Sequence, residues 1–306
     1  MMTKLNVVVS LITKENDYQL EQAASAEAAA GKLGASVQIV YASNDAVQQT
    51  QQILSFIQDP AKRPDVILAE PVGTSMEQIA RAAVKAGIGW GIINSSAEYL
   101  TDLRGQGKVP VFSVVSDHET IGKFQGQQMA ALLGDAGNVL YVEGPSVRDV
   151  AKLRTKGMLA TKPPGVSVKS IKGDWTQQSG YNAIKSWLAL TTSRQMKINM
   201  IACQNDDMAI GARRAFEELG NLQERDAWLH LPLTGCDGVP RAGQDWVRQK
   251  RMTATVIAPP LVGEAMQILA AANNSGSQPP ERTVIAPTSY PAVKDLGTGQ
   301  AQGANA

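Results

Sequence analysis

Short apolar runs alternate with longer stretches of helical periodicity along nearly the whole chain, and this alternation limits the possible folds more than any other feature. In the first part of the chain we expect strands at 7–11, 37–41, 66–69, 90–93 and 111–115, helices at 17–32, 46–58 and 75–86, a turn at 60–64 and a polar connection at 101–108. Strands that alternate with helices through short connections build right-handed β-α-β units and parallel sheets.

The same pattern restarts after a seam near residues 113–117. There we expect helices at 117–133, 147–160, 176–190, 206–219, about 239–249 and 261–273, and strands at 139–142, 166–171, 198–203, 229–233, 253–257 and 283–285, the last of the chain. The 306 residues are enough for two lobes. The predicted fold class is α/β, with two doubly wound, Rossmann-like parallel-sheet lobes, and a disordered tail at 297–306, which is rich in Gly, Gln, Ala and Asn.

A strand-to-helix corner at Gln204-Asn205-Asp206-Asp207 is the most informative single stretch. The apolar run before it reads as a buried strand, and helical periodicity follows it. We expect Asp206 or Asp207 to accept from the free amides at the helix start. Asn205 would then lie at the carboxyl end of a parallel strand, where open α/β sheets bind ligands.

Several other polar residues follow predicted strands in the same way. In doubly wound sheets such positions line one crevice. They are Asn16, Glu70, Asn94, Asp117, Asn205 and Asp237.

The charge and composition exclude several kinds of partner. Lys and Arg number 29 against 28 Asp and Glu, so the net charge of +1 argues against a dedicated nucleic-acid surface. The chain lacks an apolar run of about 18 residues, so we expect no membrane insertion. The N-terminus lacks the apolar core of a signal peptide. Two localisations stay open: periplasmic if a leader has been trimmed, and cytoplasmic if Met1 is the native start.

Catalysis finds little support in the residues. His118 and His230 are the two histidines, and we expect His230 to pack inside the strand at 229–233. The sequence has no Cys/His spacing typical of zinc, no phosphate-binding glycine motif and no nucleophile elbow. We therefore predict no enzyme activity, no cofactor and no metal. Cys203 and Cys236 are expected to be free, partly buried thiols, with a disulfide left open.

With this pattern in hand, the chain resembles the periplasmic sugar-binding proteins of the ribose-binding type and the effector domains of LacI-type repressors. The resemblance covers about residues 7–290. Its most specific marker is QNDDMAIGA at 204–212, supported by GCDG at 235–238, KLG at 32–34 and Ser116-Asp117.

The resemblance implies two lobes joined by a hinge of three crossing strands, near residues 115–117, 258–260 and 287–289. One lobe would contain 1–115 and about 259–287, and the other 117–258 and about 288–296. Ligand would bind in a cleft between the lobes and stabilise their closed form.

The resemblance also implies a set of ligand-binding residues. Tyr18 and Trp175 would stack on a sugar ring, Lys152 and Arg154 would form a basic pair, and the others would bond hydroxyls. For each residue an ordinary structural role stays open: a helix cap, a turn, half-buried packing or a solvated charge. The predicted set is Asn16, Tyr18, Glu70, Asn94, Asp117, Lys152, Arg154, Trp175, Asn205 and Asp237.

Four residues depart from the family pattern. Gln19 stands where a second aromatic is expected, Asn94-Ser95 where the family has Asp-Arg, and Ala258 where Gln is common. Polar groups built for particular hydroxyls discriminate strongly because a buried group left unpaired costs about 1–3 kcal/mol. Plain ribose is therefore disfavoured, and another sugar, a polyol or a sugar derivative is expected.

The predicted function is a monomeric solute-binding protein that captures a carbohydrate-like or polyol-like small molecule for an ABC permease or a sensor receptor. The alternative is a cytoplasmic ligand-sensing regulator without its own DNA-binding domain, because the first strand begins near residue 7 and leaves no room for a helix-turn-helix. An enzyme on the same two-lobed fold is a third hypothesis.

Overall fold

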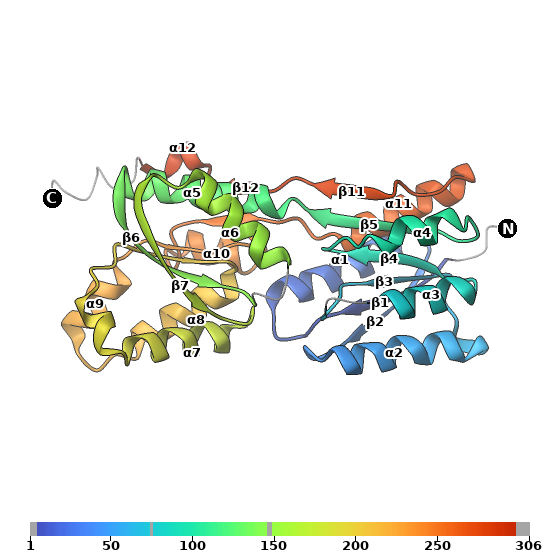
Figure 1. Ribbon diagram of the computed structural model, residues 1–306, viewed down its shortest axis with the longest axis horizontal. Coiled ribbons are helices and arrows are strands. Elements are labelled where there is room, and N and C mark those ends of the chain that lie inside the picture. The colour runs from blue at the N-terminus through green and yellow to red at the C-terminus, as the bar shows by residue number, and fades with distance from the viewer. Residues whose placement is uncertain (1–4, 74–75, 146–148, 298–306) are drawn as a thin grey trace. The chain divides into compact units, whose positions relative to one another are not determined.

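The computed structural model describes residues 5–73, 76–145 and 149–297 (Figure 1). The chain divides into two compact units. The first unit contains Met1–Ser116 and Pro260–Ile285, and the second contains Asp117–Pro259 and Ala286–Ala306. The backbone therefore passes from one unit to the other three times, after Ser116, Pro259 and Ile285.

The first unit is built on a six-stranded parallel sheet, sheet A, with the strand order β11-β5-β4-β3-β1-β2. Its strands are β1 (Asn6–Leu11), β2 (Ser36–Tyr41), β3 (Val66–Ala69), β4 (Gly89–Ile93), β5 (Val111–Ser116) and β11 (Arg282–Ile285). Its helices are α1 (Asp17–Leu33), α2 (Ala46–Gln58), the 3-10 turn η1 (Pro60–Lys62), α3 (Glu77–Lys85), α4 (Tyr99–Gly105) and α11 (Val262–Ser275).

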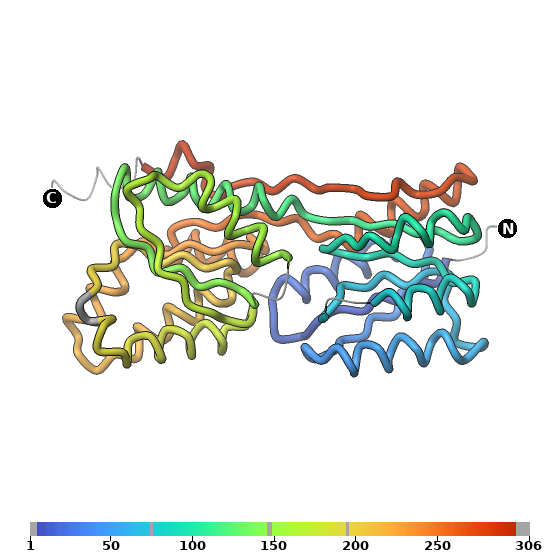
Figure 2. The backbone as a smooth tube through the Cα atoms, in the orientation of Figure 1, coloured from blue at the N-terminus to red at the C-terminus, as the bar shows by residue number. Residues whose placement is uncertain are grey.

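Helices cover both faces of sheet A, as the alternation along β1 requires. Val7 and Val9 face a core shared with α1 and α11, whereas Val8 faces a core shared with α2 and α3. The blue α1 and the orange-red α11 lie side by side in Figure 2 although they are far apart in sequence. The buried side chain of Gln22 on α1 joins them, since its Oε1 accepts from the amides of Leu261 and Val262 at the start of α11.

The second unit contains a four-stranded parallel sheet, sheet B, ordered β7-β6-β8-β9, and a two-stranded antiparallel sheet of β10 and β12. Its strands are β6 (Ala136–Glu143), β7 (Gly165–Lys172), β8 (Met200–Cys203), β9 (Leu233–Thr234), β10 (Thr255–Ile257) and β12 (Thr288–Tyr290). Its helices are α5 (His118–Leu133), α6 (Asp149–Thr161), α7 (Gln177–Leu188), the 3-10 turn η2 (Thr191–Gln195), α8 (Asp206–Glu217), α9 (Leu222–Leu229), α10 (Gly243–Arg248) and α12 (Val293–Leu296).

Alternation along β6 again separates two cores. Leu140 and Val142 pack with α7 and α8, and Val139 and Tyr141 pack with α5 and α6. The last helix, α12, lies against α5 (Figure 2). Its buried Leu296 packs into the core that Val139 and Tyr141 face.

Glycines allow the helices of the second unit to approach very closely. A Cβ at Gly157 of α6 would lie 2.0 Å from the carbonyl oxygen of Glu119 on α5, and one at Gly122 of α5 would lie 2.0 Å from that of Arg154. The backbones of α5 and α6 are therefore in direct contact at these residues. This contact fixes the helix that carries Arg154.

The two-lobed α/β fold with parallel sheets is confirmed. One predicted strand is wrong: Leu229 ends α9, residues 230–232 form a turn, and only Leu233 begins a strand, β9. His230 is the exposed C-cap residue of α9 and not a packed core group. The apolar residues there belong to the end of α9 and to the turn after it, where Trp228, Leu229 and Leu231 pack partly buried against the core.

Two further expectations are corrected at the level of elements. Residues 99–105 form helix α4, whose Leu100 and Leu103 are buried, where a polar connection was expected. The strand at 283–285 is not the last, because β12 follows and pairs antiparallel with β10. Of the tail predicted at 297–306, residues 298–306 lie outside the described residues, as do residue 75 and residues 147–148 at the starts of two predicted helices.

Substitution of Gly157 by alanine should destabilise the second unit. The added methyl group meets backbone that cannot move like a side chain, and overpacking of this kind costs about 1–3 kcal/mol. Gly31, an exposed glycine of α1 with nothing near its missing Cβ, is the matched control. Gly31→Ala should raise stability by up to about 1 kcal/mol. Urea unfolding measures both, and equal effects of the two variants would contradict the close contact of α5 with α6.

Candidate ligand-binding residues

Glu70 is the centre of a buried polar network at the carboxyl edge of sheet A. It follows β3, and only 5% of the residue is exposed. Its Oε1 accepts from Nδ2 of Asn94, which follows β4, at 2.9 Å. Its Oε2 accepts from Nε2 of Gln19, on α1, at 2.9 Å. Each oxygen of the carboxylate is therefore oriented by one side-chain amide.

Gln19 connects this carboxylate to the neighbouring strand. Its Oε1 accepts from the amide of Ile12, the residue after β1, at 2.9 Å. A second glutamine, Gln49 on α2, donates to the carbonyl oxygen of Glu70 at 2.8 Å and to Oγ of Ser10 at 3.1 Å. Because β1, β3 and β4 are neighbours in sheet A, the network spans three strand ends and holds both the main chain and the carboxylate of Glu70.

Asn16 and Tyr18 lie at the start of α1, beside Gln19 in the sequence. Asn16 is the N-cap, and its Oδ1 accepts from the amide of Gln19 at 3.1 Å. Tyr18 is buried. Between them, partial burial raises the pKa of Asp17. Asn16 therefore acts as a helix cap, which was one of the two roles considered for it. It bonds the amide of Gln19, the residue whose side chain orients Glu70.

Arg154, Trp175 and Asp237 come together at the carboxyl edge of sheet B. Nη2 of Arg154 lies 3.7 Å from Oδ1 of Asp237, and both side chains are less than 10% exposed, at 4% and 8%. The guanidinium carbon lies 5.6 Å from the centre of the Trp175 ring, within the range of a cation–π contact. Arg154 also donates to the carbonyl oxygen of Gln204. A buried ion pair of this kind is stabilised by such additional contacts.

Asn205 caps α8, which corrects the expectation that Asp206 or Asp207 would do so. Its Oδ1 accepts from the amide of Met208 at 2.9 Å, and its Nδ2 donates to the carbonyl oxygen of Trp175 at 2.8 Å. Asp207 instead accepts from Gln177 on α7 at 3.0 Å. Asn205 therefore holds the main chain of Trp175 at the same edge as Arg154.

Three predicted ligand-binding residues are among the non-glycine residues with positive φ angles, and Ser43, Asn44 and Lys250 are the others in the described parts of the chain. Asn94 has a φ of 61°, Trp175 of 63° and Asp237 of 108°. Such angles are unfavourable for side chains other than glycine, asparagine and aspartate, and they concentrate at functional sites. The ring of Trp175 also packs on Gly144, where a Cβ would lie 2.1 Å from the ring.

Two predicted residues lie apart from these groups. Asp117 is the N-cap of α5, and its two oxygens accept from the amide and the hydroxyl of Thr120 at 2.9 and 2.8 Å. Partial burial would raise the pKa of Asp117, but the bonds from Thr120 outweigh it and hold the pKa below its usual value. Lys152 is exposed and lies 3.4 Å from Asp149, so it does not form a basic pair with the buried Arg154.

Sequence reasoning did not select Gln19, Gln204 or Asp206 for the candidate site. Gln204 is fully buried, accepts from the amide of Gly144 at 2.9 Å and donates to Thr155 and to the carbonyl oxygen of Ala151. A polar residue directly after an apolar strand was the available signal for Gln204. The available signal for Gln19 was that a glutamine stands where the family pattern has a second aromatic residue.

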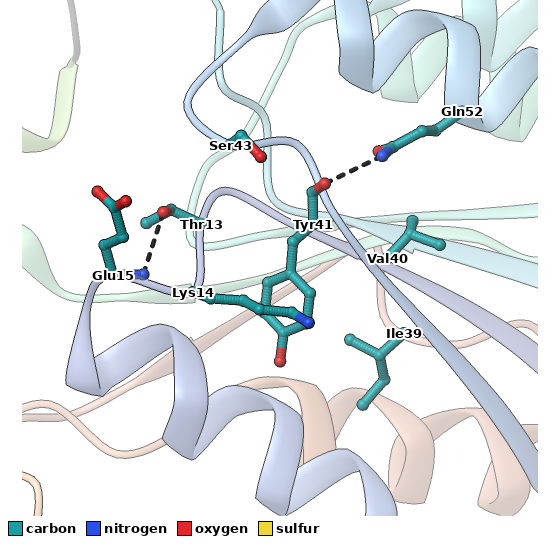
Figure 3. Close-up of a pocket in the computed structure, with 8 residues that line it drawn as sticks. All are labelled: Thr13, Lys14, Glu15, Ile39, Val40, Tyr41, Ser43 and Gln52. Carbon is teal, nitrogen blue, oxygen red and sulfur yellow. Dashed lines mark hydrogen bonds between the residues drawn. The ribbon is translucent and has the colours of Figure 1, made fainter.

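A surface pocket of about 460 Å³ lies beside the edge strand β2 (Figure 3). The chain of Lys14 lies over the ring of Tyr41 there, with Nζ 5.0 Å from the ring centre. The other lining residues include Thr13, Glu15 and Gln52, and none of the ten predicted ligand-binding residues is among them. This pocket is therefore separate from the network around Glu70.

The described parts of the chain offer no group of three His, Cys, Asp or Glu side chains that could hold a metal ion. Cys203 and Cys236 are both free and fully buried, and burial raises the pKa of each thiol, so both stay protonated. No helix within the described residues is long and apolar enough to cross a membrane.

Two units of parallel sheet, each with buried polar side chains at its carboxyl edge, define the class of two-lobed α/β binding proteins. Residues 7–276 match the family of periplasmic binding protein domains, and the chain belongs to this family. The family consists of ligand binders rather than enzymes.

Several proteins of known name are similar to the chain. The galactofuranose-binding protein YtfQ of Escherichia coli K12 is 25% identical over 292 residues, which cover 94% of this chain and 87% of that protein. A xylitol-binding protein of Mycolicibacterium smegmatis is 30% identical over 203 residues, which cover 65% of this chain and 52% of that protein.

Solved structures agree with the fold. The structure of a galactofuranose-binding protein superposes with a TM-score of 0.79 at 23% identity and covers 97% of this chain and 99% of that one. A solute-binding protein of Actinobacillus succinogenes 130z with bound D-allose has a TM-score of 0.78 at 22% identity and covers 96% of this chain and 100% of that one.

The buried carboxyl of Asp206 should make stability depend on pH. Burial first, and then the negative charge of Asp237, raise the pKa of Asp206 well above its ordinary value. A raised pKa gives stability that is present below the ordinary pKa and is lost as the pH rises through the raised one. Asp206→Asn, neutral at every pH, should avoid this loss.

The expected result is that Asp206→Asn melts at a higher temperature than the unsubstituted protein at pH 8, and that the gap narrows as the pH is lowered toward 4. Thermal unfolding followed by circular dichroism across this range measures it. The exposed Asp226 on α9 provides the control Asp226→Asn. A gap that widened at low pH would contradict the raised pKa.

Proposed function

We propose that this chain is a solute-binding protein that captures a sugar or polyol and delivers it to an ABC importer. The observation that carries the proposal is the pair of buried polar groups at the two sheet edges, Glu70 with its amides and Arg154 with Asp237. Family membership supports it, as do relatives named for binding galactofuranose, xylitol and ribose.

The side chains offer the interactions that a carbohydrate needs. Carboxylates such as those of Glu70 and Asp237 accept from hydroxyl groups, and the guanidinium of Arg154 donates to hydroxyl or ring oxygens. Trp175 and Tyr18 present aromatic faces for the C–H side of a ring. A site of this kind combines apolar faces with a few oriented polar groups, as is common for small-molecule sites.

The ligand we propose is a sugar or polyol other than ribose. Gln19 and Asn94, two of the departures from the family pattern, bond the same carboxylate of Glu70, so they act as one group. This group replaces the Asp-Arg pair implied by the resemblance. The carboxylate of Glu70 can only accept hydrogen bonds from a ligand, whereas an Asp-Arg pair would both accept and donate them. The two arrangements therefore favour ligands with different arrangements of hydroxyl groups.

We further propose that the chain acts as a monomer and that its partner is an ABC permease or a sensor receptor. Asn16, Asp117, Lys152 and Asn205 complete the proposed set of ligand-binding residues. Lys152 and Asp117 have the weaker support, because Lys152 is exposed and both oxygens of Asp117 bond Thr120.

A panel of six compounds tests the proposal: D-ribose, D-allose, D-fructose, L-arabinose, xylitol and myo-inositol. A compound that binds only the folded state raises the melting temperature, and at 100 times its Kd it stabilises by about 2.7 kcal/mol. We expect at least one compound to do so more strongly than D-ribose, and the compound to be recovered unchanged. Stabilisation by none of the six, or preference for D-ribose, would count against the proposal.

Gln19→Leu should weaken binding of the compound with the largest thermal shift about tenfold or more. The change removes one amide from the buried carboxylate of Glu70, and a buried group that loses a partner costs about 1–3 kcal/mol. The control is Gln51→Leu, at an exposed glutamine of α2. Isothermal titration calorimetry measures both variants, and an unchanged affinity for Gln19→Leu would contradict the role of the network.

A further inference from the structure

The carboxylate of Asp206 joins three segments of the second unit. It is 3% exposed. One oxygen accepts from the amide of Gly238 at 2.7 Å, and the other accepts from Oγ1 of Thr255 on β10 at 2.7 Å. The amide of Asp206 itself donates to the carbonyl oxygen of Cys236 at 2.6 Å. Asp206 therefore bonds the residues on both sides of Asp237.

Two glycines lie against this carboxylate, and a side chain at either position would collide with its oxygens. A Cβ at Gly235 would lie 2.2 Å from Oδ1 of Asp206, and a Cβ at Gly243 would lie 1.9 Å from Oδ2. Gly238 has a φ of 59°. The GCDG sequence at 235–238 therefore has two roles. It forms a turn, and its Gly235 leaves space that the carboxylate of Asp206 occupies.

The main chain of Asp237 is held on its other side by β10. Its amide donates to the carbonyl oxygen of Val256 at 2.9 Å, and its own carbonyl oxygen accepts from the amide of Ala258 at 3.0 Å. Thr255, which bonds Asp206, belongs to the same strand. The hydrogen bonds from Asp206 on one side and from β10 on the other therefore hold the main chain of Asp237 at its φ of 108°.

We infer that Asp206 is a positioning residue for ligand binding, which fixes the turn at 235–238 so that the carboxylate of Asp237 stays beside Arg154. Asp206 acts through Asp237 and does not touch the ligand. The inference rests on the proposed function only in taking Asp237 as a ligand contact. That Asp206 holds the turn at 235–238 follows from its hydrogen bonds alone and does not depend on the proposed function.

Four variants separate positioning from general stability. Asp206→Ala removes both acceptors. Asp206→Asn keeps both contacts with one of them reversed, because its Oδ1 can accept from the amide of Gly238 while its Nδ2 donates to Oγ1 of Thr255. Thr255→Val removes one donor and serves if Asp206→Ala does not fold. Asp207→Ala, which removes the neighbouring buried carboxylate of the same helix, is the control.

The first measurement is hydrogen exchange by mass spectrometry, without any ligand. Asp206→Ala should speed exchange in peptides covering 235–243 about tenfold or more, the factor expected for about 1.4 kcal/mol of lost hydrogen bonding. Thr255→Val should do so less, and Asp206→Asn should not speed exchange. Equal acceleration in Asp206→Ala and Asp207→Ala would overturn the inference, as would unchanged exchange at 235–243 in both Asp206→Ala and Thr255→Val.

The second measurement is the affinity for D-allose, xylitol and the other four panel compounds. Asp206→Ala should weaken the compound that binds best about tenfold or more, and Asp206→Asn should restore its affinity. Loss of affinity in Asp206→Asn with normal exchange would mean direct ligand contact and would overturn the positioning role. If none of the six compounds binds, the proposed function fails, whereas the exchange result still decides whether Asp206 holds the turn.

Discussion

The structure at both sheet edges depends on one constraint: a carboxylate removed from water must be hydrogen-bonded. Glu70 meets it with the amides of Gln19 and Asn94, and Asp206 with the amide of Gly238 and the hydroxyl of Thr255. An unpaired buried charge would cost several kcal/mol, so the surrounding strands and turns are held in the geometry that supplies these donors. Oriented acceptors for hydroxyl groups are a consequence of this arrangement.

Close packing of glycine-containing segments makes these networks possible. In the second unit the contact of α5 with α6 at Gly122 and Gly157 fixes the helix that carries Arg154. Gly235 and Gly243 make room for the carboxylate of Asp206, and Gly144 makes room for the ring of Trp175. Close approach at glycines therefore underlies both the packing of these helices and the placement of the proposed ligand-binding residues.

Much of the fold could be predicted from the sequence, because parallel strands buried on both faces leave a clear alternation of apolar runs and helical periods. Both units and most helices and strands followed from it, but the short helices α4, α9 and α12 did not. The strand expected at 229–233 was wrong because the end of a helix and an apolar turn look like a short strand over five residues. The antiparallel strand β12 was missed because three residues carry too little pattern, and its pairing with β10 joins residues far apart in the sequence.

The sequence by itself determined which residue types stand at the carboxyl ends of the strands, including Glu70, Asn94, Asn205 and Asp237, because the end of an apolar run can be read locally. Only the tertiary structure decided which of them meet. It joined Gln19 to Glu70 and Arg154 to Asp237, left Lys152 exposed beside Asp149, and made Asn205 rather than Asp206 the helix cap. Those outcomes depend on strand order and on helix contacts between distant residues, which no local pattern contains.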